Sequence, residues 1–246
     1  MLKDGIIAFA EEIEKIASEK QGIEYEIYAT WGDSFQVKVI GGEIDNYSVH
    51  DFIGISLRVK SDGKMGYAAT TSPDTASARE LVEKAIENAK VIESPDEQFI
   101  YQGDKDYPMP KTSDPALASV TAAEKIELAK QMEKYALEYD EKITRTMGSY
   151  VISQSSSRMI KNSNGLDVCE DFGFIAAYVI PIAKIGDDMN SGFAYTAGFN
   201  KESLDIKAAA QESAQEAIRF CGAKSCDSGN MKVIIESRAV CDLLST

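Results

Sequence analysis

Apolar residues follow two different periods along the first part of the chain. Stretches with apolar side chains at every third or fourth position predict amphipathic helices, and stretches in which apolar and polar residues alternate predict half-buried strands. The turn Ser61-Asp62-Gly63-Lys64 is typical of a tight hairpin, because Asp-Gly accepts positive φ angles. The predicted elements are a helix at residues 3–20, strands at 23–27, 35–39, 53–59 and 65–70, and a helix at 76–90.

After the second predicted helix the periodic pattern stops. The next stretch mixes proline with Asp, Gly and Ser, which is typical of an extended connection over a surface rather than of a core element. We therefore predict a first domain at residues 1–92 and a linker at residues 93–117. Four of the six prolines of the chain lie in this stretch, namely Pro95, Pro108, Pro110 and Pro115.

The second half repeats the order of helix, strands and helix. Asn164-Gly165 and Gly186-Asp187-Asp188 are predicted turns between strands. We predict a middle domain at residues 118–228 and the beginning of a C-terminal domain at residues 229–246. The predicted elements are a helix at 121–139, strands at 142–146, 150–155, 158–162, 172–185 and 192–197, a helix at 204–220 and a last strand at 231–236.

Three short segments of the first half have counterparts, in the same order, in the second half. The pairs are Glu43–Asn46 with Met159–Asn162, Asp51-Phe52 with Asp171-Phe172, and Gly66–Thr70 with Gly192–Thr196. Their shared order, with a helix before and after each set, predicts a repeated unit. The predicted fold class is therefore α+β, with two repeated units of antiparallel sheet and flanking helices, followed by the start of a truncated C-terminal β-rich domain.

Charge and composition narrow the classes of function. Lysine and arginine total 26 against 40 for aspartate and glutamate, a formal net charge of −14. Phosphate backbones and anionic membranes repel so acidic a chain, so we expect no direct nucleic acid and no membrane among its partners. Its N-terminal segment carries acids among the apolar residues, and no apolar run reaches the ~20 residues of a membrane span. We expect a soluble cytoplasmic protein with reduced thiols at Cys169, Cys221, Cys226 and Cys241.

The chain has one histidine, His50. A zinc hydrolase of the two-histidine type needs two imidazoles on one helix face and is therefore excluded. A serine or cysteine hydrolase needs a histidine beside its nucleophile, but the chain lacks a Gly-x-Ser-x-Gly motif. The favoured interpretation of His50 is a structural position on a strand or strand edge.

Other candidate residues also have simple interpretations. Cys221 and Cys226 are close enough in sequence to share a metal ion, but tetrahedral zinc needs two further ligands, so ordinary thiols are favoured. The run Ser153–Ser157 has no adjacent base and is expected to edge a strand or line a polar face. Asp187 and Asp188 are expected to be solvated, because Ca²⁺ needs six or more oxygens. Phosphate-binding glycine loops are absent. We predict no catalytic, cofactor-binding or metal-binding residue in this chain.

Motifs in a fixed order run through both halves. Those of the first half are Trp31–Phe35, Glu43–Ser48, Phe52–Val59, Asp62–Ala68 and the helix at 76–90, and those of the second half are Lys142–Thr146, Asn162–Gly165, Phe193–Thr196 and Lys232–Ile235. In order and spacing they resemble the first domain, the middle domain and the first strand of the last domain of the TldD/PmbA family. The PmbA (TldE) branch fits better than TldD.

This resemblance implies a cytoplasmic two-subunit zinc protease, whose older name is modulator of DNA gyrase. In such a pair a TldD subunit holds the metal in a His-Glu-x-x-x-His helix, a TldE/PmbA subunit lacks that motif, and the two enclose a chamber for unfolded or small peptides. The metal helix belongs to the family's last domain, of which this sequence contains only the beginning. We therefore expect a truncated protein that is inactive on its own, with zinc only in a TldD-like partner.

Three hypotheses follow in order of preference. The first is a PmbA/TldE-like non-catalytic subunit, or a fragment of one, that associates with a TldD-like subunit or with itself and shapes the peptide entrance. Its strand edges would hold an extended peptide by backbone hydrogen bonds. The second is a stand-alone regulatory protein that modulates DNA gyrase or a toxin–antitoxin component through its acidic surface. The third is an independent enzyme that uses His50 with a serine or cysteine.

Overall fold

The computed structural model describes residues 2–93, 97–104, 106–108 and 110–245. Within these ranges no helix is both long and apolar enough to cross a bilayer. The helices are α1 (Leu2–Ser18), α2 (Thr75–Val91), α3 (Ala122–Leu137), α4 (Ile206–Phe220) and α5 (Ser237–Leu244), with short 3₁₀ turns η1 (Pro115–Ser119) and η2 (Lys201–Ser203). The strands are β1 (Ile23–Ile40), β2 (Glu43–Ser61), β3 (Lys64–Thr70), β4 (Ile143–Asn162), β5 (Asp167–Ile185), β6 (Asp188–Ser191) and β7 (Ala194–Gly198).

All seven strands belong to one antiparallel sheet. Its order is β3-β2-β1-β4-β5-β6, and β7 pairs with β5 beside β6. At the centre β1 pairs with β4 over most of its length, with Asp33 opposite Ser155 near the middle. The predicted α+β class with antiparallel strands and flanking helices is confirmed, and the sheet is continuous across both halves of the chain.

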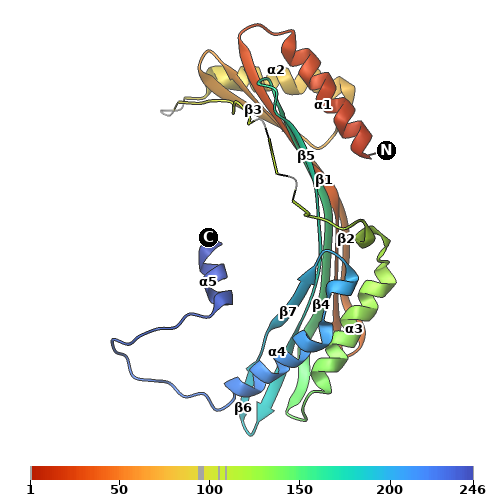
Figure 1. The fold of residues 1–246 in the computed structure, drawn as a ribbon, viewed down its shortest axis with the longest axis vertical. Coiled ribbons are helices and arrows are strands. Elements are labelled where there is room, and N and C mark those ends of the chain that lie inside the picture. The colour runs from red at the N-terminus through yellow and green to blue at the C-terminus, as the bar shows by residue number, and fades with distance from the viewer. Residues whose placement is uncertain (1, 94–96, 105, 109, 246) are drawn as a thin grey trace.

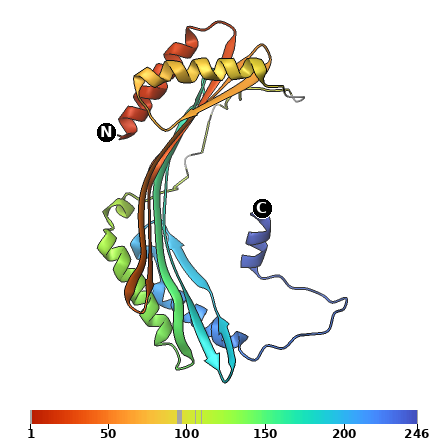
Figure 2. The ribbon, with the colours of Figure 1, turned by 180° about the vertical axis from the view of Figure 1, so that it is seen from behind.

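The sheet curls into a crescent, and helices α1 to α4 lie on its outer side (Figures 1 and 2). The burial pattern of β1 explains this placement. Its odd-numbered residues from Tyr25 to Val39 are buried, apart from Asp33, and strand side chains alternate between the two faces. One face of the same strand is therefore covered at both ends, by α1 and α2 at one end and by α3 and α4 at the other.

The two largest of three hydrophobic cores each draw on both halves of the sequence. In the first, Phe9 of α1 packs with Ile27 and Leu57, and Met159 of β4 joins them. In the second, residues of α3 and α4 pack on β4 and β5, and Val37 of β1 joins them. Each predicted unit is thus completed by a strand from the other. The domain limits at residues 92 and 118 stay a prediction.

The predicted hairpin turns are present. Asp62 and Gly63 have φ angles of 50° and 78° and connect β2 to β3 as the Asp-Gly pair predicted. The turn at Asn164-Gly165 connects β4 to β5, with Gly165 at φ 92°. Its shape is held by the Asn162 side chain, whose Oδ1 accepts hydrogen bonds from the Leu166 and Asn164 N–H groups at 3.1 and 3.0 Å.

The repeated unit is visible in the order of the elements and in one close contact. The order α1-β1-β2-β3-α2 is repeated as α3-β4-β5-β6/β7-α4. Gly66 and Gly192 occupy the same position in the two units. A Cβ on Gly66 would lie 2.0 Å from the Ala85 carbonyl oxygen, and one on Gly192 would lie 2.0 Å from the Ser213 carbonyl oxygen. In both units the strand backbone therefore touches the backbone of the following helix.

One detail of the repeat differs from the sequence comparison. Glu43–Asn46 begins the strand after a hairpin, whereas Met159–Asn162 ends the strand before one, so that pairing was wrong. Four-residue matches lack the information to fix an alignment when the turn lengths of the two copies differ. Asp51 and Asp171 do both lie on the second strand of their hairpins.

Several strand boundaries were also predicted wrongly. The segments expected at 23–27 and 35–39 form the single strand β1, and the three expected between 142 and 162 form the single strand β4. The expected strand at 231–236 is not a strand in the structure, and Ile234 there is 98% exposed. Because a strand needs a neighbour to satisfy its backbone, and no described strand lies beside this segment, its β-prone sequence remains irregular.

A buried carboxylate ties α3 to the β1–β2 hairpin. Glu133 is 2% exposed, and its Oε1 and Oε2 accept the N–H groups of Gly41 and Gly42 at 2.9 and 2.8 Å. The Thr146 hydroxyl of β4 donates to the same carboxylate at 2.5 Å. Three donors, two from the β1–β2 turn and one from β4, thus converge on one side chain.

We expect Glu133→Ala to lower the free energy of unfolding by about 3 kcal/mol, because it leaves buried donors without acceptors. Urea titration followed by circular dichroism measures this change. Glu127→Ala, an exposed glutamate on the same helix, is the matched control and should cost less than about 1 kcal/mol. Equal urea midpoints for the two variants would show that the Glu133 contacts contribute nothing net.

Candidate functional site: the inner face of the sheet

The inner face of the crescent is free of the helices that cover its outer face (Figures 1 and 2). Even-numbered residues of β1 such as Tyr28, Gln36 and Lys38 lie on it, because their neighbours at odd positions enter the two cores. The curled inner face is therefore a broad concave surface made of strand side chains.

A row of aromatic residues crosses this face at the end that α3 and α4 cover on the outer side. Lys38, Tyr150, Tyr178 and Tyr195 are successive register partners on β1, β4, β5 and β7. The rings of Tyr150 and Tyr178 stack with centroids 4.5 Å apart and an interplanar angle of 11°. The ring centroids of Phe193 and Tyr178 lie 5.5 Å apart. Cross-strand aromatic pairs of this kind stabilise a sheet and also present flat apolar surface to a ligand.

Lys38 at the end of this row is held by two neighbours. Its Nζ lies 2.9 Å from the Asp45 carboxylate and 5.8 Å from the centre of the Tyr150 ring. The hydrogen bond to Asp45 raises the pKa of Lys38 above its usual value. Burial, and then the neighbouring Tyr150, raises the pKa of Tyr178. The row thus has a lysine at one end and aromatic rings along the rest of its length.

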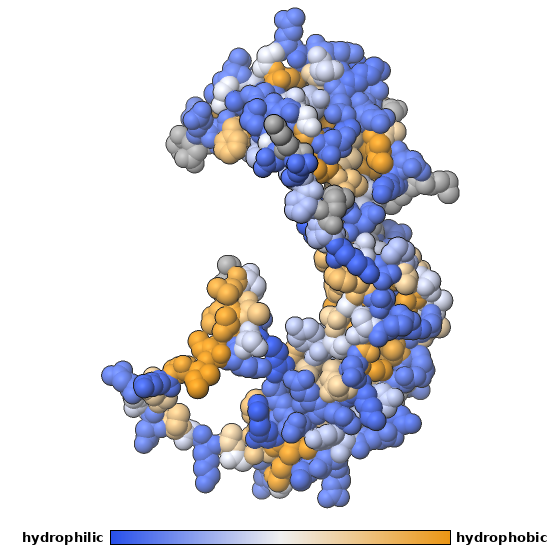
Figure 3. Space-filling view, viewed as in Figure 1, coloured by the Kyte–Doolittle hydropathy of each residue, from blue (hydrophilic) through white to orange (hydrophobic). Residues whose placement is uncertain are grey.

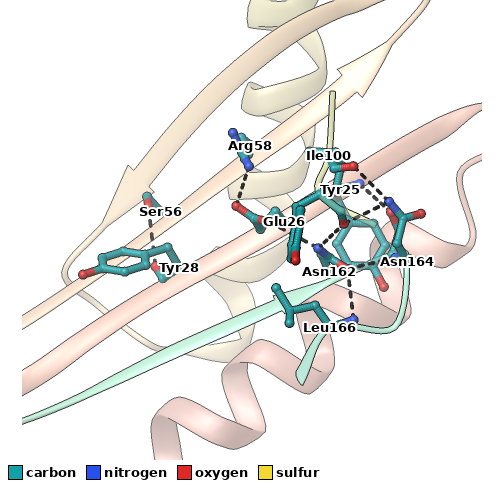
Figure 4. Close-up of polar contacts among 11 residues, drawn as sticks. Tyr25, Glu26, Tyr28, Ser56, Arg58, Ile100, Asn162, Asn164 and Leu166 are labelled. Atoms are coloured by element: carbon teal, nitrogen blue, oxygen red, sulfur yellow. Dashed lines mark hydrogen bonds and ion pairs between the residues drawn. The ribbon is translucent and has the colours of Figure 1, made fainter. Parts of the chain in front are cut away.

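A row of polar residues crosses the same face at the end that α1 and α2 cover on the outer side (Figure 4). Arg58 of β2 pairs with Glu26 of β1 at 2.7 Å, and the Asn162 amide of β4 donates to Glu26 at 3.3 Å. The same amide donates to the Tyr101 carbonyl oxygen at 2.9 Å. This row fastens the connecting segment near residue 101 to the sheet.

The connecting segment also borders a cavity on the inner face. Tyr107 and Pro108 lie over β4 and β5 and enclose about 270 Å³ with Arg158 and Glu170. Further along, the Thr112 carbonyl oxygen accepts the Gly173 N–H at 2.9 Å, so the segment runs along the edge of β5. The inner face is therefore bounded by this segment at β5.

The structure does not bring the predicted candidate residues together into a catalytic group. His50 is exposed on β2 opposite Ser34, away from the cysteines. Burial raises the pKa of the Cys169 thiol, which makes it less reactive, and Cys221 lies at the end of α4 against backbone carbonyls. Cys226 is exposed. Among the described residues no group of three or more His, Cys, Asp or Glu side chains is placed to hold a metal ion.

The serine run and the acidic turn have structural surroundings. Ser153–Ser157 lies within β4 in the interior of the sheet, and Ser157 donates to the Asp171 carboxylate at 2.6 Å. Asp188 begins β6 and accepts the Gly222 N–H at 2.5 Å, while Asp187 is exposed. The serines line a polar position, as predicted, but at the centre of the sheet rather than at its edge.

One feature that the sequence did not indicate lies on the outer face. A cavity of about 590 Å³ separates the two helical layers and is lined by Lys3, Asp33, Asp51, Asp171 and the serines of β4. Asp33 and Asp51 are direct register partners on β1 and β2. The two residues are neighbours only because of the register between β1 and β2, and no local sequence pattern indicates that register.

The C-terminal segment lies in the hollow of the crescent. Arg238 of α5 binds Glu216 of α4 at 3.0 Å and also contacts the Phe193 carbonyl oxygen. The space-filling view shows an apolar patch on this segment (Figure 3). Its exposed apolar residues are Met231, Val233, Ile234, Ile235, Leu243 and Leu244.

Comparisons with known sequences match most of the chain. The family model described as PmbA/TldA metallopeptidase domain 1 matches residues 25–89, and that of the PmbA/TldA metallopeptidase central domain matches residues 115–220. Metalloprotease PmbA of Escherichia coli O157:H7 is 27% identical over 196 residues, which are 78% of this chain and 42% of that protein. This chain therefore spans less than half the length of that relative.

Solved structures share the fold. A Thermotoga maritima protein named for a proposed role as a modulator of a DNA gyrase has a TM-score of 0.81 at 23% identity, over 90% of this chain and 50% of that one. TldE from Thermococcus kodakarensis has a TM-score of 0.75 at 21% identity, over 85% and 47%. A Bacteroides thetaiotaomicron protein, also named for a proposed modulation of DNA gyrase, has a TM-score of 0.75 at 22% identity, over 93% and 53%.

Proposed function

Because the chain belongs to the PmbA/TldD metallopeptidase family, we propose that it is a PmbA/TldE-like, non-catalytic part of a cytoplasmic zinc metallopeptidase that acts on unfolded or small peptides. Its contribution is to associate with a TldD-like partner and to admit the peptide. The catalytic metal then belongs to the partner.

The observation that carries this proposal is the inner face of the sheet, which none of the helices α1 to α4 covers. An extended peptide of arbitrary sequence needs flat apolar surface and a few fixed polar groups, and the face offers both. The stacked pair Tyr150–Tyr178 supplies the apolar surface, and Lys38 supplies a cation held in place by Asp45. Neither row contains a nucleophile beside a base, which supports a binding role.

The residues described do not fit a zinc ion. A hydrolytic zinc needs three protein ligands around an open position, and no such group of His, Cys, Asp and Glu side chains occurs in the described ranges.

We expect the isolated chain to cleave neither fluorescently labelled casein nor short labelled peptides, with or without added zinc. Adding a TldD-like chain should produce cleavage that is lost with a chelator, because the metal site is then supplied. A matched control is the TldD-like chain alone. Zinc-dependent cleavage by this chain alone, surviving repeated purification, would overturn the proposed role.

A regulatory binding role is the second candidate, and the net charge of −14 favours it. A protein that docks on a basic partner through surface charge should lose affinity steeply between low and physiological salt. Size-exclusion chromatography with a TldD-like chain and with DNA gyrase, each at two salt concentrations, separates the candidates. Salt-resistant association with the TldD-like chain supports the subunit role.

A further inference from the structure

Strand β2 is longer than its neighbour at the margin of the sheet. β3 pairs only with residues Ile55–Ser61 of β2, and the remaining part, residues 43–54, has β1 on one side. Among the described residues no strand pairs with its other side. These twelve residues of β2 therefore present an open strand edge in line with β3.

In the second unit the corresponding edge is filled only in part. β6 and β7 pair with Ile182–Ile185 and Ile175–Val179 of β5, as β3 pairs with Ile55–Ser61 of β2. Beyond β7, the Thr112 carbonyl oxygen of the connecting segment accepts the Gly173 N–H. Because Asp51 and Asp171 hold the same place in their hairpins, this contact shows that an extended chain can lie along the edge.

Beyond a bulge next to the hairpin, the open edge has little of the usual protection against added strands. Natural sheets protect their edges with proline, lysine, bulges or covering elements. Residues 43–54 contain no proline, lysine or arginine, and Ile44, Tyr47 and Val49 are 47%, 48% and 52% exposed. The register shift opposite Lys38 and Val39 leaves Asp45 of β2 as a bulge next to the hairpin, and the pairing is regular from Asn46 onward.

The register also shows which backbone groups face the open side. Ser61 and Lys64 flank the two-residue turn and therefore form a hydrogen-bonded pair, so every second residue back from Ser61 directs its N–H and C=O away from β1. In the open part these residues are Ile53, Asp51, Val49 and Tyr47.

Charge indicates which peptide fits this edge. Asp51 is the direct register partner of Asp33 on β1, and like charges directly opposite destabilise a sheet. Both side chains line the cavity of the outer face. A strand added to β2 would place one of its own side chains beside Asp51, in the same row. A lysine or arginine at that position offsets the repulsion between the Asp33 and Asp51 carboxylates. The two carboxylates therefore favour a basic peptide.

We propose that the edge of β2 between residues 43 and 53 binds an extended basic peptide as an additional antiparallel strand in line with β3. The peptide's lysine or arginine lies against Asp51 and Asp33, and its apolar side chains cover Tyr47 and Val49. The inference rests on the proposed function for its ligand class, a peptide, and deepens it by naming the edge and the charge preference. A second copy of this chain is disfavoured as the occupant, because each copy carries a net charge of −14.

Binding of labelled peptides tests the proposal without proteolysis or a partner subunit. The probe is a fluorescein-labelled ten-residue peptide of alternating Val and Thr with one central Lys, measured by fluorescence anisotropy. The control peptide has Glu in place of Lys. We expect the Lys peptide to bind the 246-residue chain at least about tenfold more tightly than the Glu peptide, since one charge-assisted contact is worth that much.

Two protein variants locate the site. Val49→Pro removes one outward N–H and should lower the affinity for the Lys peptide at least about tenfold. The matched Val49→Thr keeps that N–H, and its affinity should stay within about twofold of the wild type. Asp51→Asn should remove the preference for Lys over Glu, and Glu19→Gln, an exposed acid on the turn after α1, should leave it unchanged. Thermal unfolding checks that each variant is folded.

Equal binding to Val49→Pro and Val49→Thr, or no preference for the Lys peptide, would overturn the proposal. So would a concentration-dependent dimer of the wild-type chain that Val49→Pro abolishes in sedimentation equilibrium, because a second copy would then occupy the edge. The proposed function fails by a different result, which is zinc-dependent cleavage by this chain alone. The two failures can therefore be distinguished.

Discussion

Gly192→Ala should lower the free energy of unfolding by about 3 kcal/mol or more, and Gly66→Ala should do the same in the other unit. A Cβ on Gly192 would lie 2.0 Å from the Ser213 carbonyl oxygen and 2.5 Å from the Ala217 nitrogen. A Cβ on Gly66 would meet the Ala85 carbonyl oxygen at 2.0 Å and the Ala89 nitrogen at 2.3 Å. Because the obstructing atoms are helix backbone, the whole helix must move away from the strand, which opens the core beneath it.

Denaturant unfolding followed by the fluorescence of Trp31, the one tryptophan and a member of the first core, measures the effect. Gly5→Ala is the matched control, because nothing lies within 4 Å of a Cβ there. Within α1 this change should be neutral or stabilising by about 0.5–1 kcal/mol. Wild-type stability in both Gly66→Ala and Gly192→Ala would mean that the close strand–helix contact of the repeat is not as tight as the structure has it.

A chain cut between Gly103 and Asp104 should remain one folded particle. The two fragments share the β1–β4 pairing from Glu26 to Val39, and each core contains residues of both. Separating them would expose the apolar side chains of two cores to water, at a cost of about 25 cal/mol for each Å². We therefore expect that the fragments part only in denaturant, and that residues 1–103 expressed alone do not fold.

The measurement uses a specific protease site inserted at that position, followed by size-exclusion chromatography under native conditions. A second site after Ser228 is the matched control. It frees a segment that Arg238 anchors through contacts to Glu216 and Phe193, and we expect this short piece to dissociate. Native separation of the two large fragments would show that the units fold independently, as a boundary within residues 93–117 suggests.

The local elements were predictable where local signals are strong. The helices follow from the three- to four-residue spacing of apolar residues, and the Asp62-Gly63 turn follows from its need for positive φ angles. The strands were predicted too short wherever polar residues interrupt the pattern. Residues Gly32 to Ser34 break the alternation of β1, but β2 and β4 pair with them on both sides and keep the backbone extended.

The candidate site was predictable only in its outline. The resemblance of motifs indicated the family and a role in admitting peptides, and it placed no catalytic residue in the chain. The row from Lys38 through Tyr150 to Tyr178 was not predicted, because these residues are brought together by the register of three strands. The carboxylates of Asp33 and Asp51 are neighbours for the same reason.

The sequence by itself determined the class of fold, the order of the elements, the repeat and the family, because each depends on short-range periodicity or on motifs that remain together along the chain. The tertiary structure alone decided that the two units share one curled sheet, that the four large helices cover its outer face, and that no described strand pairs with the outer side of residues 43–54. These features depend on which strands pair and in which register. Pairing joins residues more than a hundred positions apart, such as Ser34 and Gln154, and no local pattern records it.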